Sequence, residues 1–295
     1  MTASTAEQLH RMLRSPVVFA KAIRGGYTPA SRWVVKLEDG RSAFVKQASD
    51  ESIVPRLRRE HDVYAHLNGP WRPDVLAFED GEQPVLVLED LSACHWPPPW
   101  KARQVDAVRA TLDRVAAHPL PPGLSRVADT DMAEGGWPDV ARDPAPFLKL
   151  GLCSQQWLDE ALPSLRGAAD PTLLDGSALC HLDVRSDNLC FRPDGQAILI
   201  DWDCAAVGNP EFDFAFWLPS LHLEGGPTPE SIGTVTPGVV ALVAGFFASR
   251  AGLPNIPIAP GVRGIQRRQL AVALPWAASV LGLISPDGSG SDRLP

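Results

Sequence analysis

The segment HLDVRSDN, residues 181–188, places four ionisable side chains and an asparagine between two short apolar segments. Polar side chains cost free energy when they are buried without partners, so a charged loop in this position is either a solvated turn or a functional site. The functional interpretation requires matching groups elsewhere in the chain. Asp201 is one of them, because it ends the apolar segment AILI, which is typical of a buried strand.

Asp183, Asn188 and Asp201 all lie close to the ends of predicted strands. A loop bounded by strands can bring the three side chains onto one wall of a site. Two carboxylates and an amide oxygen are hard oxygen ligands, which suit Mg²⁺ when phosphate oxygens and water complete its coordination. The set therefore predicts a magnesium-bound polyphosphate as the ligand.

Phosphoryl transfer needs a bridging cation, a carboxylate that orients the attacking hydroxyl, and positive side chains near the phosphates. Lys46 ends a predicted strand, and Glu60 on the following helix could fix it by ion pairing. The loop IRGGYTPAS precedes that strand pair, and its two glycines would let backbone amides approach a phosphate closely. Its candidate nucleotide contacts are Gly25, Gly26 and Ser31.

The elements before residue 92 are those of a small antiparallel sheet. The dipeptide Asp39-Gly40 favours a tight hairpin, and β-rich segments lie on both sides of it. The predicted elements are a helix over 6–14 capped by Ser4 or Thr5, strands at about 32–37 and 42–47, a helix over 51–67, and a second hairpin over 75–91. This order predicts one main helix against the sheet.

The character of the chain changes after Leu91, where the proline-rich ACHWPPPW predicts a stiff connector. The elements predicted beyond it are helices over 101–118 and 147–165, an irregular segment over 119–146, three short strands around the opening segment and over 196–203, and helices from Glu211 onward. The sequence therefore predicts an α+β, two-lobed protein. An N-terminal nucleotide-binding lobe spans 1–91, a connector 92–100, and a larger, mostly helical catalytic and acceptor-binding lobe 101–295.

These residues resemble the aminoglycoside phosphotransferase and choline kinase family, whose small-molecule kinases share the protein-kinase fold. The matching residues are His181, Asp183 and Asn188 of HLDVRSDN, Asp201 of LIDWD, and Gly208, Pro210, Asp213 and Ala215 of VGNPEFDFA, with weaker matches at Lys46 and Glu60. The pattern HxDxxxxN becomes specific when a strand ending in aspartate and then GxPxxDxA follow it. Only residues 179–218 match strongly, although the order of elements agrees over nearly the whole chain.

The resemblance implies ATP as the phosphate donor, with GTP left open because backbone groups read the base. The implied roles are Asp183 as the catalytic carboxylate, Asn188 and Asp201 as Mg²⁺ ligands, Lys46 as the contact of the α and β phosphates with Glu60 as its partner, and backbone groups near Glu89, Asp90 and Leu91 as the adenine site.

Other residues of the motif take less direct roles in this interpretation. Arg185 stands where many serine/threonine kinases carry a lysine, and we place it with the catalytic residues as a contact of the transferred phosphate. His181 and Asp213 are expected to hold the loop through its backbone. Asp187 and Asp203 either touch a second metal or are solvated carboxylates. Leu182 departs from the glycine or arginine found in relatives, so the backbone of the loop is expected to differ.

Composition excludes several classes of protein. A net charge of −8 without a run of Lys or Arg gives no electrostatic footprint for nucleic acid. The longest apolar segment, near 239–248, is far shorter than the roughly 20 residues that span a bilayer. The N-terminus does not resemble a secretion signal, so we expect a cytoplasmic protein. Five cysteines without a CxxC pair favour reduced, mostly buried thiols.

The phosphate acceptor is a hydroxylated small molecule, but its identity is open. Polycationic aminoglycosides call for carboxylate-lined pockets, and only two acids lie between Ser231 and the C-terminus, against five arginines. This favours an acceptor of low positive charge, although acids at Glu211, Glu224 and Glu230 keep a cationic one possible. The tryptophans that could line a sugar-stacking pocket are Trp96, Trp100, Trp137, Trp157, Trp217 and Trp276.

Two further classes are weighed against a small-molecule kinase. A nucleotide-binding pseudokinase or regulatory module is disfavoured because every catalytic group is present. A protein kinase is disfavoured because no APE-like segment follows LIDWD, and an unrelated metal hydrolase explains fewer of the residues. The sequence does not separate antibiotic resistance from a metabolic role, or a monomer from a homodimer.

Overall fold

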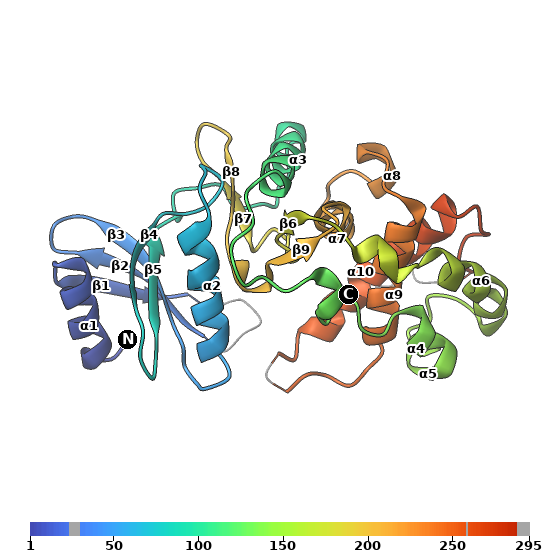
Figure 1. The fold of residues 1–295 in the computed structure, drawn as a ribbon, viewed down its shortest axis with the longest axis horizontal. Coiled ribbons are helices and arrows are strands. Elements are labelled where there is room, and N and C mark those ends of the chain that lie inside the picture. The colour runs from blue at the N-terminus through green and yellow to red at the C-terminus, as the bar shows by residue number, and fades with distance from the viewer. Residues whose placement is uncertain (24–29, 258, 288–295) are drawn as a thin grey trace. The chain divides into compact units, whose positions relative to one another are not determined.

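The computed structural model describes residues 1–23, 30–257 and 259–287 (Figure 1). Its chain divides into two compact units, residues 1–97 with 187–204 and residues 98–186 with 205–295. In the first unit the elements are α1 (Ala3–Leu13), β1 (Val17–Ala22), β2 (Ser31–Leu37), β3 (Ser42–Gln47), α2 (Val54–His66), β4 (Val75–Glu79), β5 (Val85–Glu89), β7 (Leu189–Phe191), β8 (Ala197–Leu199) and the 3₁₀ helix η3 (Trp202–Cys204). This composition is the α+β type that the sequence predicts.

The first unit is built on a five-stranded antiparallel sheet with the strand order β1-β2-β3-β5-β4. The hairpin of β2 and β3 turns at Gly40, whose φ of 86° is readily adopted only by glycine. Both predicted hairpins are present, and the strands of the first lie within one residue of the predicted 32–37 and 42–47. β1 adds an edge strand that is not among the predicted elements.

Alternation along the strands gives the sheet two different faces. One face packs against Leu9 and Leu13 of α1, and its buried residues are Trp33, Val35, Leu37, Ala43, Val45, Val85 and Val87. The residues between them, including Val34, Phe44 and Lys46, line a cavity on the opposite face. The sheet therefore separates an apolar core from the cavity.

The cap of α1 differs from the prediction. Thr2, rather than Ser4 or Thr5, caps the helix, and its side chain accepts a hydrogen bond from the Thr5 amide at 3.1 Å. Thr2 has an extended backbone, as capping residues require, whereas Ser4 and Thr5 already lie within the helix. Thr5 is buried and donates to the Gln47 side chain at 3.2 Å, so it connects α1 to the sheet instead.

α2 packs with the first unit through Leu57, Glu60, Val63 and Tyr64, which are its buried residues. The β7–β8 hairpin also belongs to this unit: the Leu199 amide donates to the Trp71 carbonyl at 2.8 Å, and His95 and Phe191 exchange two backbone hydrogen bonds. The compact units thus differ from the predicted lobes, because residues 187–204 lie with the sheet rather than with the helical part. Sequence order hides this arrangement, since long-range backbone pairing decides it.

The second unit is mostly helical. Its elements are α3 (Ala102–Ala116), η1 (Val127–Asp129), α4 (Trp137–Arg142), α5 (Ala145–Leu148), α6 (Gln155–Ala168), η2 (Pro171–Leu174), β6 (Ala178–Cys180), β9 (Ala206–Gly208), α7 (Glu211–Leu223), α8 (Pro229–Ile232), α9 (Pro237–Arg250) and α10 (Val262–Val280). α9 is apolar on nearly all sides and buried, as the composition of residues 239–248 predicts. β6 and β9 form a short antiparallel pair, and the segment HLDVRSDN begins directly after β6.

Two predictions of secondary structure in this unit were wrong. The helix expected over 147–165 is interrupted, because Gly151 has a left-handed φ of 68° and Ser154 starts a new helix by accepting from the Trp157 amide. The segment 119–146, expected to be irregular, contains the short helix α4. Trp137 of this helix is buried and donates to the Ala241 carbonyl at 2.8 Å, so tertiary packing holds the helix in place.

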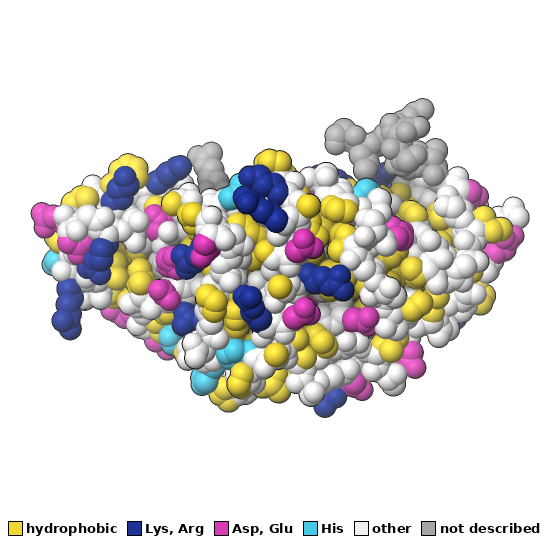
Figure 2. All heavy atoms as spheres, turned by 90° about the horizontal axis from the view of Figure 1, so that it is seen from above, with side chains coloured by type: hydrophobic (Ala, Val, Ile, Leu, Met, Phe, Trp, Pro, Cys, Tyr) yellow, Lys and Arg dark blue, Asp and Glu magenta, His cyan; other side chains and the backbone are white. Residues whose placement is uncertain are grey.

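The charged side chains and the cysteines are distributed as the composition of the sequence predicts. No helix among the described residues is long and apolar enough to cross a membrane. Positive and negative side chains are interspersed over the face shown in Figure 2. All five cysteines are free, and burial raises the pKa of Cys153 to about 12 and that of Cys180 and Cys190 still further, so these thiols are protonated.

Candidate active site

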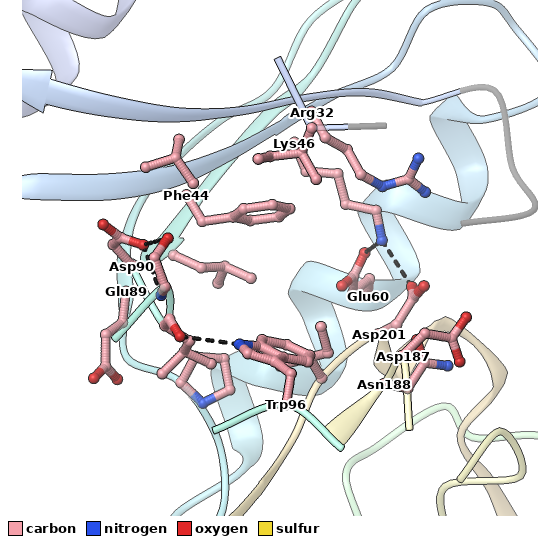
Figure 3. A pocket seen from close by; sticks show the side chains of 17 residues that line it. Arg32, Phe44, Lys46, Glu60, Glu89, Asp90, Trp96, Asp187, Asn188 and Asp201 are labelled. Atoms are coloured by element: carbon pink, nitrogen blue, oxygen red, sulfur yellow. Dashed lines mark hydrogen bonds and ion pairs between the residues drawn. The ribbon is translucent and has the colours of Figure 1, made fainter. Parts of the chain in front are cut away.

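A cavity of about 350 Å³ lies within the first unit (Figure 3). Its apolar part is formed by side chains of the sheet and of the connector, among them Val34, Phe44, Leu88 and Trp96. The rings of Phe44 and Trp96 lie on opposite sides of the cavity. Its polar part holds Lys46, Glu60, Asp187, Asn188 and Asp201. A mostly apolar cavity with a few converging polar groups is typical of a small-molecule site, and its size falls within the usual range.

Lys46 is the centre of the polar part. Its Nζ lies 2.6 Å from Glu60 Oε2 and 2.7 Å from Asp201 Oδ1, so the ion pair predicted between Lys46 and Glu60 is present. Burial alone would lower the pKa of Lys46, but the two carboxylates outweigh burial and raise it. Lys46 of β3 is therefore a charged ammonium at neutral pH, and it is held by Glu60 of α2 and by Asp201 after β8.

Local structure explains why these three groups meet. Lys46 lies on the same face of β3 as Phe44, and Glu60 lies on the buried face of α2, where only 2% of its surface is exposed. Asp201 follows β8 with a φ of 65°, a left-handed conformation that costs a residue other than glycine about 1 kcal/mol. Strain of this kind is concentrated at functional sites, because the surrounding structure must hold it.

The oxygen ligands at this end of the cavity fit Mg²⁺. Asn188 and Asp201, the predicted ligands, line the cavity together with Asp187, and the Ile200 amide donates to the Asn188 carbonyl at 2.9 Å. The described residues contain no group of three or more His, Cys, Asp or Glu side chains arranged to hold a metal ion. An amide and one or two carboxylates are nevertheless the donor set that Mg²⁺ uses when phosphate oxygens and water supply its other ligands.

Asp203 is engaged elsewhere. Its Oδ2 accepts from Arg56 Nε at 2.6 Å, and its side chain is 9% exposed. The sequence left open whether Asp203 is a solvated carboxylate or touches a second metal. In the structure Asp203 is half-buried and pairs with Arg56 of α2, one helical turn before Glu60, so it is not a freely solvated carboxylate.

The residues at the apolar end of the cavity have side chains that are held by neighbouring residues. Glu89 forms a two-point ion pair with Arg192 at 2.5 and 2.6 Å, and Asp90 accepts from Ser92. The Leu91 carbonyl accepts from Trp96 Nε1 at 3.1 Å. Glu89, Asp90 and Leu91 all line the cavity, as expected for an adenine site. Trp96 was considered in the sequence only as an acceptor-site aromatic, and the structure places it in this cavity instead.

The predicted phosphate loop is only partly described. Gly25 and Gly26 lie outside the described residues. Ser31 begins β2 and is not among the residues that line the cavity, whereas its neighbour Arg32 is. The sequence contained a signal for this difference: Val34 belongs to the cavity face of β2, and period-two alternation places Arg32 on that same face.

The segment 181–186 belongs to the second unit. Asp213 on α7 accepts from the His181 amide at 2.7 Å and from the Leu182 amide at 2.6 Å. The Asp183 amide donates to His181 Nδ1 at 3.2 Å, and His181 is fully buried. These contacts are those of a scaffold, as the sequence predicts for both residues. Burial raises the pKa of Asp213, while the nearby His181 and the two amide donors oppose that shift.

Asp183 itself remains accessible. Its side chain is 31% exposed and lies 3.2 Å from Arg185 Nη2, so the two predicted catalytic residues form an ion pair. Leu182, the departure from the pattern of the family, adopts a left-handed φ of 63°. The chain passes from the second unit to the first between Ser186 and Asp187, so the motif HLDVRSDN contributes residues to both units.

Glu224 is a site residue that the sequence did not single out beyond its charge. It follows α7 and accepts from Ser186 Oγ at 2.5 Å and from Trp100 Nε1 at 2.9 Å. Trp100 in turn packs on Trp217, with ring centroids 5.7 Å apart. Of the tryptophans that could line an apolar or sugar-stacking pocket, four are buried core residues: Trp137, Trp157, Trp217 and Trp276. Only Trp100 remains as a half-buried candidate in the second unit.

Replacing Glu224 tests whether its hydrogen bonds or its charge hold the loop. We expect Glu224→Ala to lower the free energy of unfolding by about 1–3 kcal/mol, because two donors lose an ionised acceptor. Glu224→Gln should stay within about 1 kcal/mol of the wild type, since its oxygen can accept from Trp100 while its NH₂ donates to the Ser186 hydroxyl. Urea unfolding measures both, and equal losses in the two variants would show that charge rather than hydrogen bonding matters.

The fold and the site define a protein of the protein-kinase-like class. A comparison with families matches residues 20–231 to the phosphotransferase enzyme family. Among solved structures, an aminoglycoside phosphotransferase APH(4)-Ia is 16% identical, with coverage of 98% of this chain and 100% of that one and a TM-score of 0.58. Choline kinase LicA from Streptococcus pneumoniae is 15% identical, with 94% and 98% coverage and a TM-score of 0.62.

A third structure, of the aminoglycoside phosphotransferase APH(2")-IIa with streptomycin and ATP, is 13% identical, with coverage of 92% of this chain and 97% of that one and a TM-score of 0.54. These likenesses confirm the predicted fold. Because the family match covers most of the chain, the protein belongs to the phosphotransferase enzyme family and is a phosphotransferase.

Proposed function

We propose that the protein transfers the γ-phosphate of ATP to a hydroxyl group of a small molecule. The observation that supports this proposal is the position of Lys46. Its ammonium forms ion pairs with Glu60 and Asp201 at the polar end of the cavity of about 350 Å³. Phosphoryl transfer depends mostly on positioning and electrostatic stabilisation, and such a group of charges supplies both.

The nucleotide would occupy the cavity of the first unit. Its base would lie between Phe44 and Trp96 and bond to backbone groups of the connector at Glu89–Leu91, and its phosphates would extend towards Lys46. Asn188 and Asp201 would hold Mg²⁺, which would supply positive charge to offset that of the phosphates. Backbone recognition of the base favours neither ATP nor GTP by itself, and we propose ATP because the solved relative APH(2")-IIa was determined with ATP.

Asp183 would orient the acceptor hydroxyl and take its proton. In the reaction, the acceptor oxygen forms a bond to the γ-phosphorus as the bond from that phosphorus to the leaving oxygen of ADP breaks. The hydroxyl proton passes to the Asp183 carboxylate. We propose that Arg185, which pairs with Asp183 at 3.2 Å, contacts the transferred phosphate. The 31% exposure of Asp183 supports its role, because a catalytic carboxylate must be reachable by the acceptor.

The acceptor class remains the finer part of the proposal. The solved relatives include proteins named for aminoglycosides and for choline, all of which carry both hydroxyl and cationic groups. Glu224 is a carboxylate that contacts the loop of Asp183 through the Ser186 hydroxyl. The shortage of acids after Ser231 favours an acceptor with little positive charge. A screen of ATP consumption over sugars, amino alcohols, nucleosides and antibiotics would identify it.

A pseudokinase or regulatory module is the alternative. It is not favoured, because Lys46, Glu60, Asp183, Asn188 and Asp201 are all present and the first, second and last of these are joined by ion pairs. Slow hydrolysis of ATP by the wild type, lost in a variant of Asp183, would separate an enzyme from a protein that only binds nucleotide.

Nucleotide binding is tested by thermal unfolding with ATP and Mg²⁺. At a nucleotide concentration about 100-fold above Kd, binding adds about 2.7 kcal/mol to stability, which raises Tm by several degrees. We expect Asp201→Asn to lose most of this shift, because the substitution removes an anionic metal ligand. Asp62→Asn, a change of the same kind at a side chain that is 76% exposed, is the matched control and should keep it. A wild type without any shift at millimolar nucleotide would contradict the proposed function.

A further inference from the structure

Arg32 is a cationic side chain of the cavity that neither the sequence motifs nor the family match assigns. It lies on β2 directly opposite Lys46 of β3 in the register of the sheet. Both residues line the cavity, and Figure 3 shows the Arg32 guanidinium on the same side of the cavity as the Lys46 ammonium. Arg32 Nη1 donates to the Ala30 carbonyl at 3.1 Å, a contact that helps to hold the side chain at the start of its strand.

The charges of the polar end show why a second cation matters there. Lys46 has three N–H donors, and its ion pairs with Glu60 and Asp201 use two of them. Asp187 adds a further carboxylate to the lining of the cavity. A polyphosphate entering this end would therefore meet more acidic than basic groups if Lys46 acted alone. Metal binding would offset part of this excess, and Arg32 supplies the second fixed positive charge.

The chemistry of arginine suits this position. A guanidinium is permanently charged and presents its donors in a planar fork that can bind two phosphate oxygens at once. Lys46 is held by two carboxylates and acts as a point charge. The Arg32 guanidinium on the neighbouring strand faces the same cavity. It can contact the phosphates without breaking the ion pairs of Lys46 with Glu60 and Asp201.

We propose that Arg32 is a second phosphate-binding residue, which contacts the polyphosphate of the nucleotide alongside Lys46. The inference rests on the proposed function, since it assumes that a nucleotide occupies this cavity. It assigns to Arg32 the part that the sequence analysis gave to its neighbour Ser31.

The test is a series of ligands that differ only in phosphate number. Isothermal titration calorimetry with adenosine, AMP, ADP and ATP in the presence of Mg²⁺ is carried out on the wild type, Arg32→Ala and Arg32→Lys. We expect Arg32→Ala to weaken the binding of ADP and of ATP by about 10- to 100-fold, the range for the loss of a charged hydrogen-bond donor. Adenosine should bind within about twofold of the wild type. Arg32→Lys should fall between the two, because it keeps the charge but not the fork.

Lys36→Ala is the matched control. Lys36 lies four residues further along β2, is exposed and does not line the cavity, so its loss removes one positive charge from the same strand. Its affinities for all four ligands should remain within about twofold of the wild type. An equal weakening by Lys36→Ala would attribute the effect to general electrostatics and overturn the role of Arg32.

The remaining outcomes separate the inference from the proposed function. A wild type that binds none of the ligands contradicts the proposed function itself. If Arg32→Ala binds ATP as tightly as the wild type does, the inference is overturned and the proposed function is left intact. Equal weakening of adenosine and ATP by Arg32→Ala would mean a structural role and also overturn it. If Arg32→Ala does not fold, the comparison of Arg32→Lys with the wild type across the same ligands decides.

Discussion

Asp183→Asn is expected to lower kcat by about 10²- to 10⁴-fold, the usual contribution of a positioned acid–base group. Asparagine keeps the shape of the side chain but cannot accept the proton of the acceptor hydroxyl. The KM for ATP should change little, because Asp183 is not among the residues that line the cavity of the first unit. Initial rates of ADP release, with the acceptor found by screening or with water alone, measure both constants.

Asp175→Asn is the control for this substitution. Asp175 lies in the same unit, is 52% exposed and pairs with Arg126 at 2.7 Å, so its replacement removes a similar charge without touching the loop. Its kcat should stay within about twofold of the wild type. If Asp183→Asn kept kcat within about threefold, Asp183 could not be the catalytic carboxylate, and the proposed chemistry would need another proton acceptor.

Much of the first unit follows from local sequence signals. Asp39-Gly40 and the strands beside it define a hairpin because the turn requires a left-handed glycine, which Gly40 provides with a φ of 86°. The meeting of Lys46 with Glu60 was also predictable, since a lysine near the end of a strand can pair with a carboxylate on the helix that follows it. The contacts of His181 and Asp213 follow the same logic, because a buried loop must satisfy its backbone amides.

The features that sequence could not supply depend on contacts distant in the chain. Arg56 and Asp203 lie 147 residues apart, and nothing local in either segment indicates that they pair. Ser186 and Glu224 are joined by a hydrogen bond across 38 residues, and nothing local to either residue indicates this contact. The inclusion of residues 187–204 in the first unit has the same origin, because backbone pairing with distant segments determines it.

Asp213→Ala is expected to lower the free energy of unfolding by about 2–6 kcal/mol. The substitution leaves the amides of His181 and Leu182 without their acceptor in a site where Asp213 is 3% exposed, and each buried unsatisfied donor costs about 1–3 kcal/mol. Asp213→Asn should lose about half as much. Its oxygen can accept from one amide, whereas its NH₂ group would face the other donor.

Urea unfolding followed by tryptophan fluorescence measures these losses, with Asp175→Ala as the exposed control, expected to change stability by no more than about 0.5 kcal/mol. Because the raised pKa of Asp213 shows that burial disfavours its ionised form, removal of the charge also relieves a desolvation cost. That relief opposes the loss of the two hydrogen bonds. If Asp213→Asn were as stable as the wild type, the relieved desolvation cost would equal the free energy of the lost hydrogen bond. The negative charge of Asp213 would then not be needed to hold the loop of Asp183.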